Sequence, residues 1–150
     1  MSEREKPWTD APSHHKRILV LSDNPISRAI ETIATAVGRE VHIEAVDDGG
    51  PGLQPGPRDA VVLCDHDAPD APAVLRAALA SESPYVAMMA SRSRAVAVAD
   101  ELAAEGVDTS TLHVPAGHDL GGKGPGEIAL SVVAEIVAES YERPGGPLRG

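Results

Sequence analysis

Four clusters of polar residues in this sequence could do chemistry, and each directly follows an apolar run. In the first, "LVLSDNPISRAI" (19–30), the candidates are Ser22, Asp23, Asn24 and Ser27. Many nucleotide-binding domains carry glycines at such a corner, because backbone N–H groups then close around a pyrophosphate at a helix N-terminus. This corner has no glycine, and the Asp23 carboxylate repels a phosphate. A helix cap made by Asp23 or Asn24 explains most of the stretch, and we expect NAD(P) to bind weakly or not at all.

The second cluster, "CDHDAPD" (64–70), contains Asp65, His66 and Asp67. Carboxylates and imidazole suit both metal binding and acid–base catalysis. Their spacing matches no ligand signature, and Asp-rich turns commonly cap helices. We therefore favour the structural interpretation and expect no metal site. Cys64 is expected to be a small buried hydrophobe rather than a nucleophile, because no base that could assist it is identifiable.

The third and fourth clusters follow later apolar runs. In "ASRSR" (90–94), Ser91 and Arg92 open a helix, so a hydroxyl, backbone N–H groups and a guanidinium could converge on an anion. A serine N-cap followed by solvated arginines explains the same residues equally well, and both interpretations stay open. In "HVPAGHD" (113–119), His113 and His118 could titrate near neutral pH, although a lone histidine in such a loop is more often structural.

Apolar runs alternate with helical patterns, which predicts an α/β fold. Strands are expected at 17–22, 41–46, 59–64, 85–90 and 111–115, and helices at about 25–37, 70–80, 92–105 and 125–141. The Gly- and Pro-rich segment 47–58 is expected to be a loop. Together these indicate a three-layer Rossmann-like domain with a parallel sheet of about five strands in the order 3-2-1-4-5. One edge of that sheet should gather Asn24, Asp65, His66, Ser91 and Arg92 around a cleft.

Composition narrows the classes of function. A chain of 150 residues suits one domain, expected at 16–142 between tails at 1–15 and 143–150. The formal charge of -10 argues against nucleic acid, because nothing would neutralise a polyanion. One cysteine and no long apolar run predict a cytoplasmic protein without a membrane partner.

Two family resemblances follow from the motifs. "RILVLSDNPISRAIETIATAVGREVHIEAVDDG" resembles a response-regulator receiver, but the residue before Pro115 is Val114, where that family has a lysine. "SPYVAMMASRSRAVAVADELAAEGV" followed by "LHVPAGHDLGGKGPGEIALSVVAEIVA" resembles the C-terminal Rossmann-like domain of the XdhC/CoxI family, accessory proteins of molybdenum hydroxylases. The family's Gly-Ser-Arg and His-x-Pro-x-Gly-x-Asp-x-Gly motifs are matched here by Ala90-Ser91-Arg92 and by His113, Pro115, Gly117, Asp119 and Gly121.

The second resemblance implies an accessory module rather than an enzyme. It would hold, protect or insert molybdenum cofactor into a partner hydroxylase, or bind a partner protein, and the chain could form a homodimer. The cofactor-binding residues that we expect are Ser22, Asp23, Asn24, Ser27, Asp65, His66, Ser91, Arg92, His113, Gly117 and Asp119. Two alternatives remain: a nicotinamide-dependent oxidoreductase, with Glu44 or Asp47 as the ribose-binding residue, and a degenerate receiver-like or structural dimerisation domain.

Overall fold

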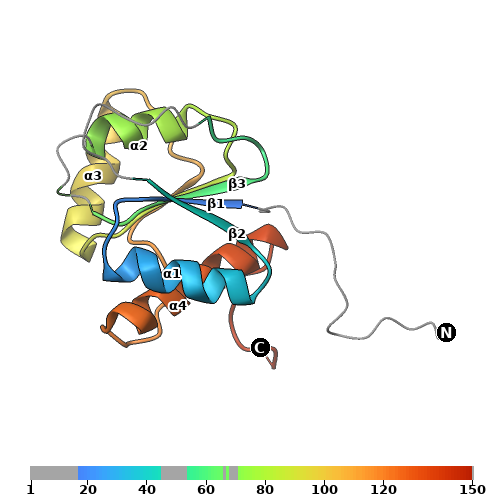
Figure 1. The fold of residues 1–150 in the computed structure, drawn as a ribbon. Coiled ribbons are helices and arrows are strands. Elements are labelled where there is room, and N and C mark those ends of the chain that lie inside the picture. Colours follow the sequence, from blue (N-terminus) through green and yellow to red (C-terminus); the bar gives the residue numbers. More distant parts are fainter. Residues whose placement is uncertain (1–16, 45–53, 66, 68–70, 150) are drawn as a thin grey trace.

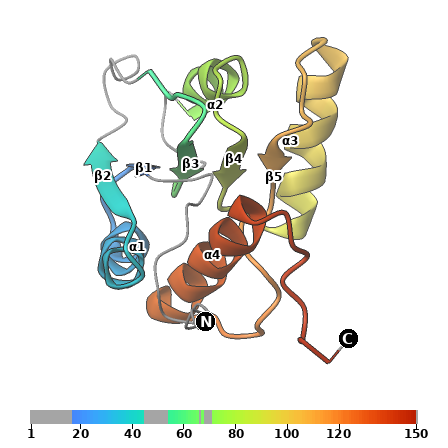
Figure 2. The same ribbon diagram turned by 90° about the vertical axis from the view of Figure 1, so that its right-hand side faces the viewer.

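The described part of the chain forms a five-stranded sheet with helices on both faces (Figure 1, Figure 2). The computed structural model describes residues 17–44, 54–65, 67 and 71–149, so the predicted tail 1–15 lies outside it. The strands are β1 (Arg17–Leu21), β2 (Glu40–Glu44), β3 (Asp59–Leu63), β4 (Tyr85–Met88) and β5 (Leu112–His113). The helices are α1 (Pro25–Ala36), α2 (Ala71–Leu79), α3 (Arg92–Ala104) and α4 (Pro125–Ser140).

The predicted fold class is confirmed, but the predicted strand order is wrong. All four strand pairs are parallel, and the order is β2-β1-β3-β4-β5 instead of 3-2-1-4-5. The two strands differ in polarity. Residues 60–63 of β3 are all apolar and buried, whereas β2 alternates polar and apolar residues and has no buried residue. A strand that is apolar on both faces suits the centre of the sheet, and β3 lies there, between β1 and β4. Glu40, His42 and Glu44 give β2 the polar alternation of a strand with one exposed side.

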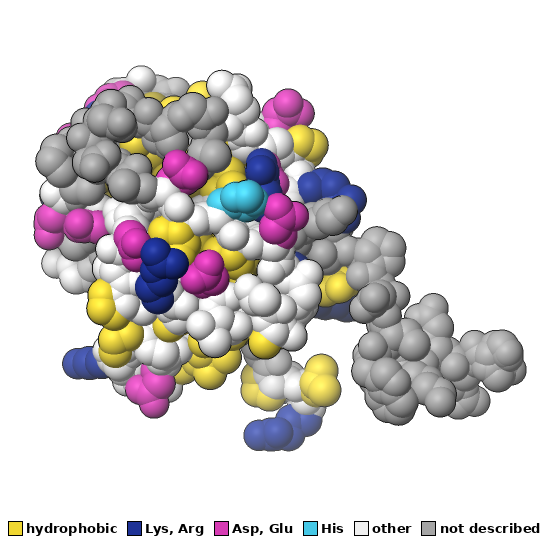
Figure 3. All heavy atoms as spheres, in the orientation of Figure 1, with side chains coloured by type: hydrophobic (Ala, Val, Ile, Leu, Met, Phe, Trp, Pro, Cys, Tyr) yellow, Lys and Arg dark blue, Asp and Glu magenta, His cyan; other side chains and the backbone are white. Residues whose placement is uncertain are grey.

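The exposed surface near β2 carries many carboxylates. Figure 3 shows Asp and Glu side chains spread over the face that carries α1 and β2, with hydrophobic groups between them. Residues 54–58 contain no helix, as expected, and the rest of the predicted loop lies outside the described residues. None of the described helices combines the length and the apolar character needed to cross a membrane.

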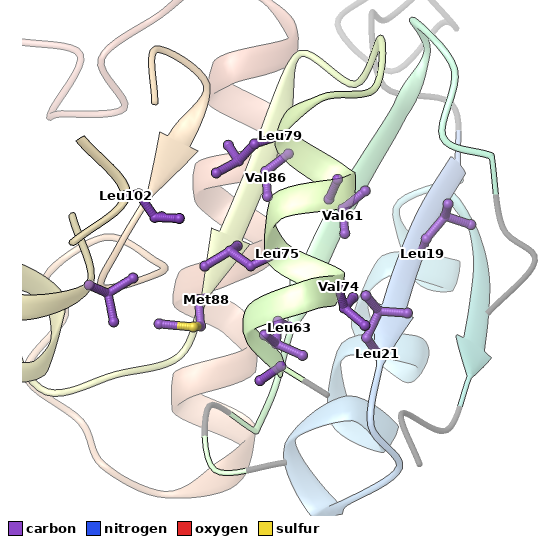
Figure 4. Packing of buried hydrophobic residues seen from close by; sticks show 13 residues of the cluster. Leu19, Leu21, Val61, Leu63, Val74, Leu75, Leu79, Val86, Met88 and Leu102 are labelled. Atoms are coloured by element: carbon purple, nitrogen blue, oxygen red, sulfur yellow. The ribbon is translucent and has the colours of Figure 1, made fainter. Parts of the chain in front are cut away.

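Two apolar cores cover the two faces of the sheet. Alternate residues of each central strand point to opposite sides, so Leu19, Val61 and Val86 pack under α2 and α3 (Figure 4). Ile18 and Val62 are among the residues that pack against α1 and α4 on the other face. The sheet is therefore the middle of three layers, and the loops after its strands meet at one edge.

Candidate functional site

The corner after β1 is closed by Asn24, the N-cap residue of α1. Asn24 Oδ1 accepts hydrogen bonds from the backbone N–H groups of Ile26 and Ser27, both at 3.0 Å. Asn24 Nδ2 donates to the Cys64 carbonyl oxygen at 3.3 Å. Ser27 Oγ accepts from the Asn24 N–H at 2.7 Å and completes a capping box. The first-turn N–H groups of Ile26 and Ser27, which could hold a phosphate here, are therefore already bonded.

The other two residues of this corner also have structural partners. Asp23 accepts two hydrogen bonds from the Arg28 guanidinium, at 2.9 and 2.7 Å, on the exposed side of α1. The same guanidinium lowers the pKa of Asp23. The Ser22 N–H donates to the Glu44 carbonyl oxygen at 2.7 Å. The geometry thus favours the helix-cap interpretation of this corner over a phosphate loop.

The second cluster, after β3, also has structural explanations. Cys64 is only 6% exposed, and burial together with the Asp65 carboxylate raises the pKa of its thiol to about 12. Asp65 Oδ1 accepts from the Asp67 N–H at 2.9 Å, an Asx-turn. His66 lies outside the described residues. Within the described ranges, no group of three His, Cys, Asp or Glu side chains is arranged to hold a metal ion.

An open cleft of about 570 Å³ lies at the carboxyl ends of β4 and β5. Its walls are the start of α3, the loop from β5 to α4 and the first two turns of α4. The polar side chains that line it belong to Ser91, Arg92, His118, Asp119, Lys123 and Ser131. A cleft of this volume is in the range of small-molecule and cofactor sites.

Arg92 and Asp119 face each other across this cleft. Arg92 Nη2 lies 3.7 Å from Asp119 Oδ2, and the two side chains are 87% and 81% exposed. An ion pair this exposed is weak. Ser91 caps α3 by accepting a hydrogen bond from the Arg94 N–H at 3.2 Å. The guanidinium of Arg92 is therefore held only loosely, at the N-terminus of a helix.

The loop that forms the opposite wall is anchored from below by Glu135 of α4. Glu135 Oε1 accepts hydrogen bonds from the Gly117 N–H at 2.9 Å and from the Tyr85 hydroxyl at 2.6 Å. Tyr85 is fully buried, and burial, with the Glu135 carboxylate, raises the pKa of its phenol well above the usual range. Gly117 has a φ of +100° and contacts Ser131 so closely that a Cβ would collide with Ser131 Oγ.

The two histidines of the fourth cluster have different surroundings. His113 stacks on the Tyr85 ring, with centroids 4.4 Å apart, and its Nδ1 lies 3.0 Å from the Thr111 carbonyl oxygen. This contact fits the structural interpretation. His118 lines the cleft, and its Nε2 is buried without a hydrogen-bond partner among the described residues. Gly145, in the segment predicted to be a tail, packs against the His118 ring.

The structure brings together only part of the predicted set of residues. Ser91, Arg92, Gly117 and Asp119 line the cleft, and their role in binding stays a prediction. The expected residues that do not line it are Ser22, Asp23, Asn24, Ser27, Asp65 and His113. The sequence analysis missed Lys123 and Glu135. The glycine run "GHDLGGKG" around Lys123 was a usable signal, but nothing local marks Glu135, whose role comes from contacts 18 and 50 residues away.

The family model of the XdhC Rossmann domain matches residues 18–136 of the chain. The chain belongs to this family. All residues that line the cleft fall inside the matched range. The expectation drawn from the motifs of the later half is thereby confirmed at the level of the family.

A solved structure has the same fold as this XdhC Rossmann domain. It is described as a xanthine dehydrogenase from Bacillus halodurans, with a TM-score of 0.72 and 21% sequence identity. The match covers 86% of this chain and 44% of the other, so the chain spans less than half the length of that protein. A search of curated proteins gave no match.

Proposed function

We propose that this XdhC Rossmann domain is an accessory module in the maturation of a molybdenum hydroxylase of the xanthine or carbon monoxide dehydrogenase type. The observation that carries the proposal is the cleft at the ends of β4 and β5, whose walls hold Arg92 and Lys123 in a chain with a net charge of -10. Membership of the family and the likeness to a protein described as a xanthine dehydrogenase support the same role.

In this proposal the molybdenum cofactor is cargo that the cleft holds before delivery to the partner enzyme. The cofactor carries a pterin and a phosphate, and supplies the metal centre of the hydroxylase. Arg92 and Lys123 suit the phosphate, because charge-assisted hydrogen bonds to phosphate are strong. The Asp119 carboxylate suits the N–H groups of a pterin. The backbone of Gly117 and Gly121 lets a flat ring approach the loop closely.

Binding rather than catalysis is the better-supported role for this cleft. The Ser91 hydroxyl is occupied by the Arg94 N–H, and Ser131 Oγ donates to the Ile128 carbonyl oxygen at 2.7 Å. Both hydroxyls therefore serve helix geometry. The oxidoreductase alternative has less support, because the Asn24 side chain takes the N–H groups that a dinucleotide pyrophosphate needs.

The proposal is tested with the purified chain and molybdenum cofactor released from a denatured hydroxylase. After gel filtration, the oxidised pterin that stays with the protein is measured by fluorescence. We expect roughly one pterin per chain, and clearly less with Arg92→Ala. Arg28→Ala, an exposed arginine at the other corner, is the matched control and should retain as much pterin as the wild type.

An accessory module could also act by binding the hydroxylase itself through the cleft or its rim. A pull-down with a purified molybdenum hydroxylase tests this. If the chain retains no pterin and captures no hydroxylase, the proposed function is wrong.

A further inference from the structure

The N-terminus of a helix carries free N–H groups and a partial positive charge. The described helices differ in how many side chains bond to these groups or balance this charge. At α1, Asn24 accepts from two first-turn N–H groups, and Asp23 lies beside it. At α4, Glu127 lies in the first turn, where a carboxylate complements the positive end of the helix dipole. A Cβ at Gly122 would collide with this carboxylate, so Glu127 lies directly behind the glycine loop.

At α3 the first turn begins with Arg92 and, like the first turns of α1 and α2, contains no acidic residue. Ser91 Oγ accepts a hydrogen bond from one first-turn N–H, that of Arg94, and lies 3.3 Å from Ser93 Oγ. This end of the helix opens on the cleft, where Lys123 lies in the facing loop. Two cationic side chains and the positive end of a helix thus border one hollow of about 570 Å³, in a chain with a net charge of -10.

Asp119 is the carboxylate that faces Arg92. Its distance of 3.7 Å and the exposure of both side chains leave the pair weak. An incoming phosphate offers Arg92 bidentate hydrogen bonds that this geometry with Asp119 does not make. Asp119 therefore competes with an anion for the same guanidinium without blocking it.

We infer that the cleft, and not the corner after β1, binds a phosphate or pyrophosphate group, with Arg92 and Lys123 as its ligands and Asp119 as an internal competitor. The inference rests on the proposed function for the identity of the cleft as a binding site, and it names the chemistry that the cleft recognises. The anion site is thus expected at the ends of the fourth and fifth strands and not at the end of the first.

The test uses inorganic pyrophosphate as the probe, with the full chain at low salt and neutral pH. Affinity is measured by calorimetry, and the site is mapped by amide chemical shifts. We expect shifts at residues 90–93 and 117–123 and none at 22–27. Arg92→Ala should weaken binding by about tenfold or more, as loss of a charge-assisted contact predicts. Lys123→Ala should weaken it by a smaller factor.

Two further variants separate a specific site from general electrostatics. Asp119→Asn should tighten binding by about twofold to fivefold, because the competitor for Arg92 is removed. Arg28→Ala changes the net charge by the same amount as Arg92→Ala, at the other corner, and should leave the affinity within about twofold. If Arg92→Ala fails to fold, judged by thermal unfolding, Arg92→Gln replaces it.

Several results would overturn the inference: no binding at millimolar pyrophosphate, shifts centred on residues 22–27, equal losses in Arg92→Ala and Arg28→Ala, or weaker binding by Asp119→Asn. A competition experiment then asks which larger phosphate-containing molecule displaces pyrophosphate from the cleft. Displacement of pyrophosphate by ADP or by molybdenum cofactor supports the assignment, and displacement by neither contradicts it.

The two proposals fail separately. Pterin retention without pyrophosphate binding leaves the accessory function standing and removes the phosphate site. If pyrophosphate binds at the cleft but the chain retains no pterin and captures no hydroxylase, the phosphate site stands and the accessory function is wrong.

Discussion

At the scale of single residues, Asn24 decides what the first corner of the sheet can do. Its amide uses both ends: the oxygen accepts from two N–H groups of α1, and the nitrogen donates to the carbonyl oxygen of Cys64 after β3. One side chain thus caps a helix and ties two neighbouring strand ends together. An anion at this place would have to displace it.

Asn24→Ala is expected to lower the free energy of unfolding by about 1 kcal/mol, the usual cost of losing an N-cap. Urea denaturation measures the change. Asp23→Ala is the control: it removes an ion pair between side chains that are each more than half exposed, so its loss should be clearly smaller. Equal losses in the two variants would show that the cap does not stabilise this corner.

Asp59 gives the protein a defined response to acid. Two hydrogen bonds from the Arg17 guanidinium, at 2.9 and 2.6 Å, lower the pKa of Asp59, and one from the Gly56 N–H adds to this, against partial burial, which acts to raise it. Since the folded pKa lies below the unfolded value, the stabilisation is complete above roughly pH 4 and is lost as pH falls through the folded pKa.

Asp59→Asn should therefore be less stable than the wild type at neutral pH. The difference in urea midpoint should shrink as the pH is lowered below roughly 4. A difference that stays constant down to the acid unfolding of the wild type would mean that the ionised carboxylate contributes no stability.

At the scale of elements, the loop from β5 to α4 is shaped from beneath. Glu135 holds the Gly117 N–H, and the His118 N–H donates to the Ser131 carbonyl oxygen at 3.2 Å. Both contacts come from α4, so the helix sets the position of the wall that faces Arg92. The close approach of loop and helix requires a glycine at 117.

Gly117→Ala and Gly121→Ala form a matched pair that tests this contact. Both glycines have positive φ, +100° and +86°, so both variants carry backbone strain of about 1–2 kcal/mol. A Cβ at Gly121 meets nothing within 4 Å, whereas one at Gly117 collides with Ser131.

Gly117→Ala should therefore cost about 1–3 kcal/mol more than Gly121→Ala, the usual range for overpacking. Thermal or urea unfolding of both variants measures the difference. Equal losses would mean that the loop moves freely away from α4.

At the scale of the whole molecule, the order of the strands determines which of the loops at the carboxyl edge of the sheet are neighbours. With β3 between β1 and β4, the corner after β1 adjoins the end of β3, and Asn24 bonds to Cys64 there. The cleft instead lies at the ends of β4 and β5, on the other side of β3. A dinucleotide that needs the first corner therefore meets a capped helix and a carboxylate.

Titration with NAD or NADP is accordingly expected to give no dissociation constant in the micromolar range, which would correspond to about -8 kcal/mol. Calorimetry at neutral pH measures this. Asn24→Gly, which frees the N–H groups of Ile26 and Ser27, is the comparison variant, and it should bind no more weakly than the wild type. Micromolar binding by the wild type, lost on mutation of the corner, would revive the oxidoreductase alternative.

The sequence by itself determined the type and position of the described helices and strands, because periodicity and turn residues are local properties. Continuous apolar strands likewise predicted a parallel sheet with a helical layer on each face. The motif "ASRSR" and the run from His113 to Gly121 placed Arg92, Gly117 and Asp119 near the ends of two strands. These strands proved to be neighbours, and the three residues line one cleft.

Only the tertiary structure decided which strands pair and which polar groups are already in use. In the order β2-β1-β3-β4-β5, the wholly apolar part of β3 lies inside the sheet and the polar β2 lies at its edge. The roles of Asn24 and Glu135 depend on partners 40 and 50 residues away. Such contacts leave no local pattern, because a hydrogen-bonding side chain acquires its partner only when distant segments are brought together by packing.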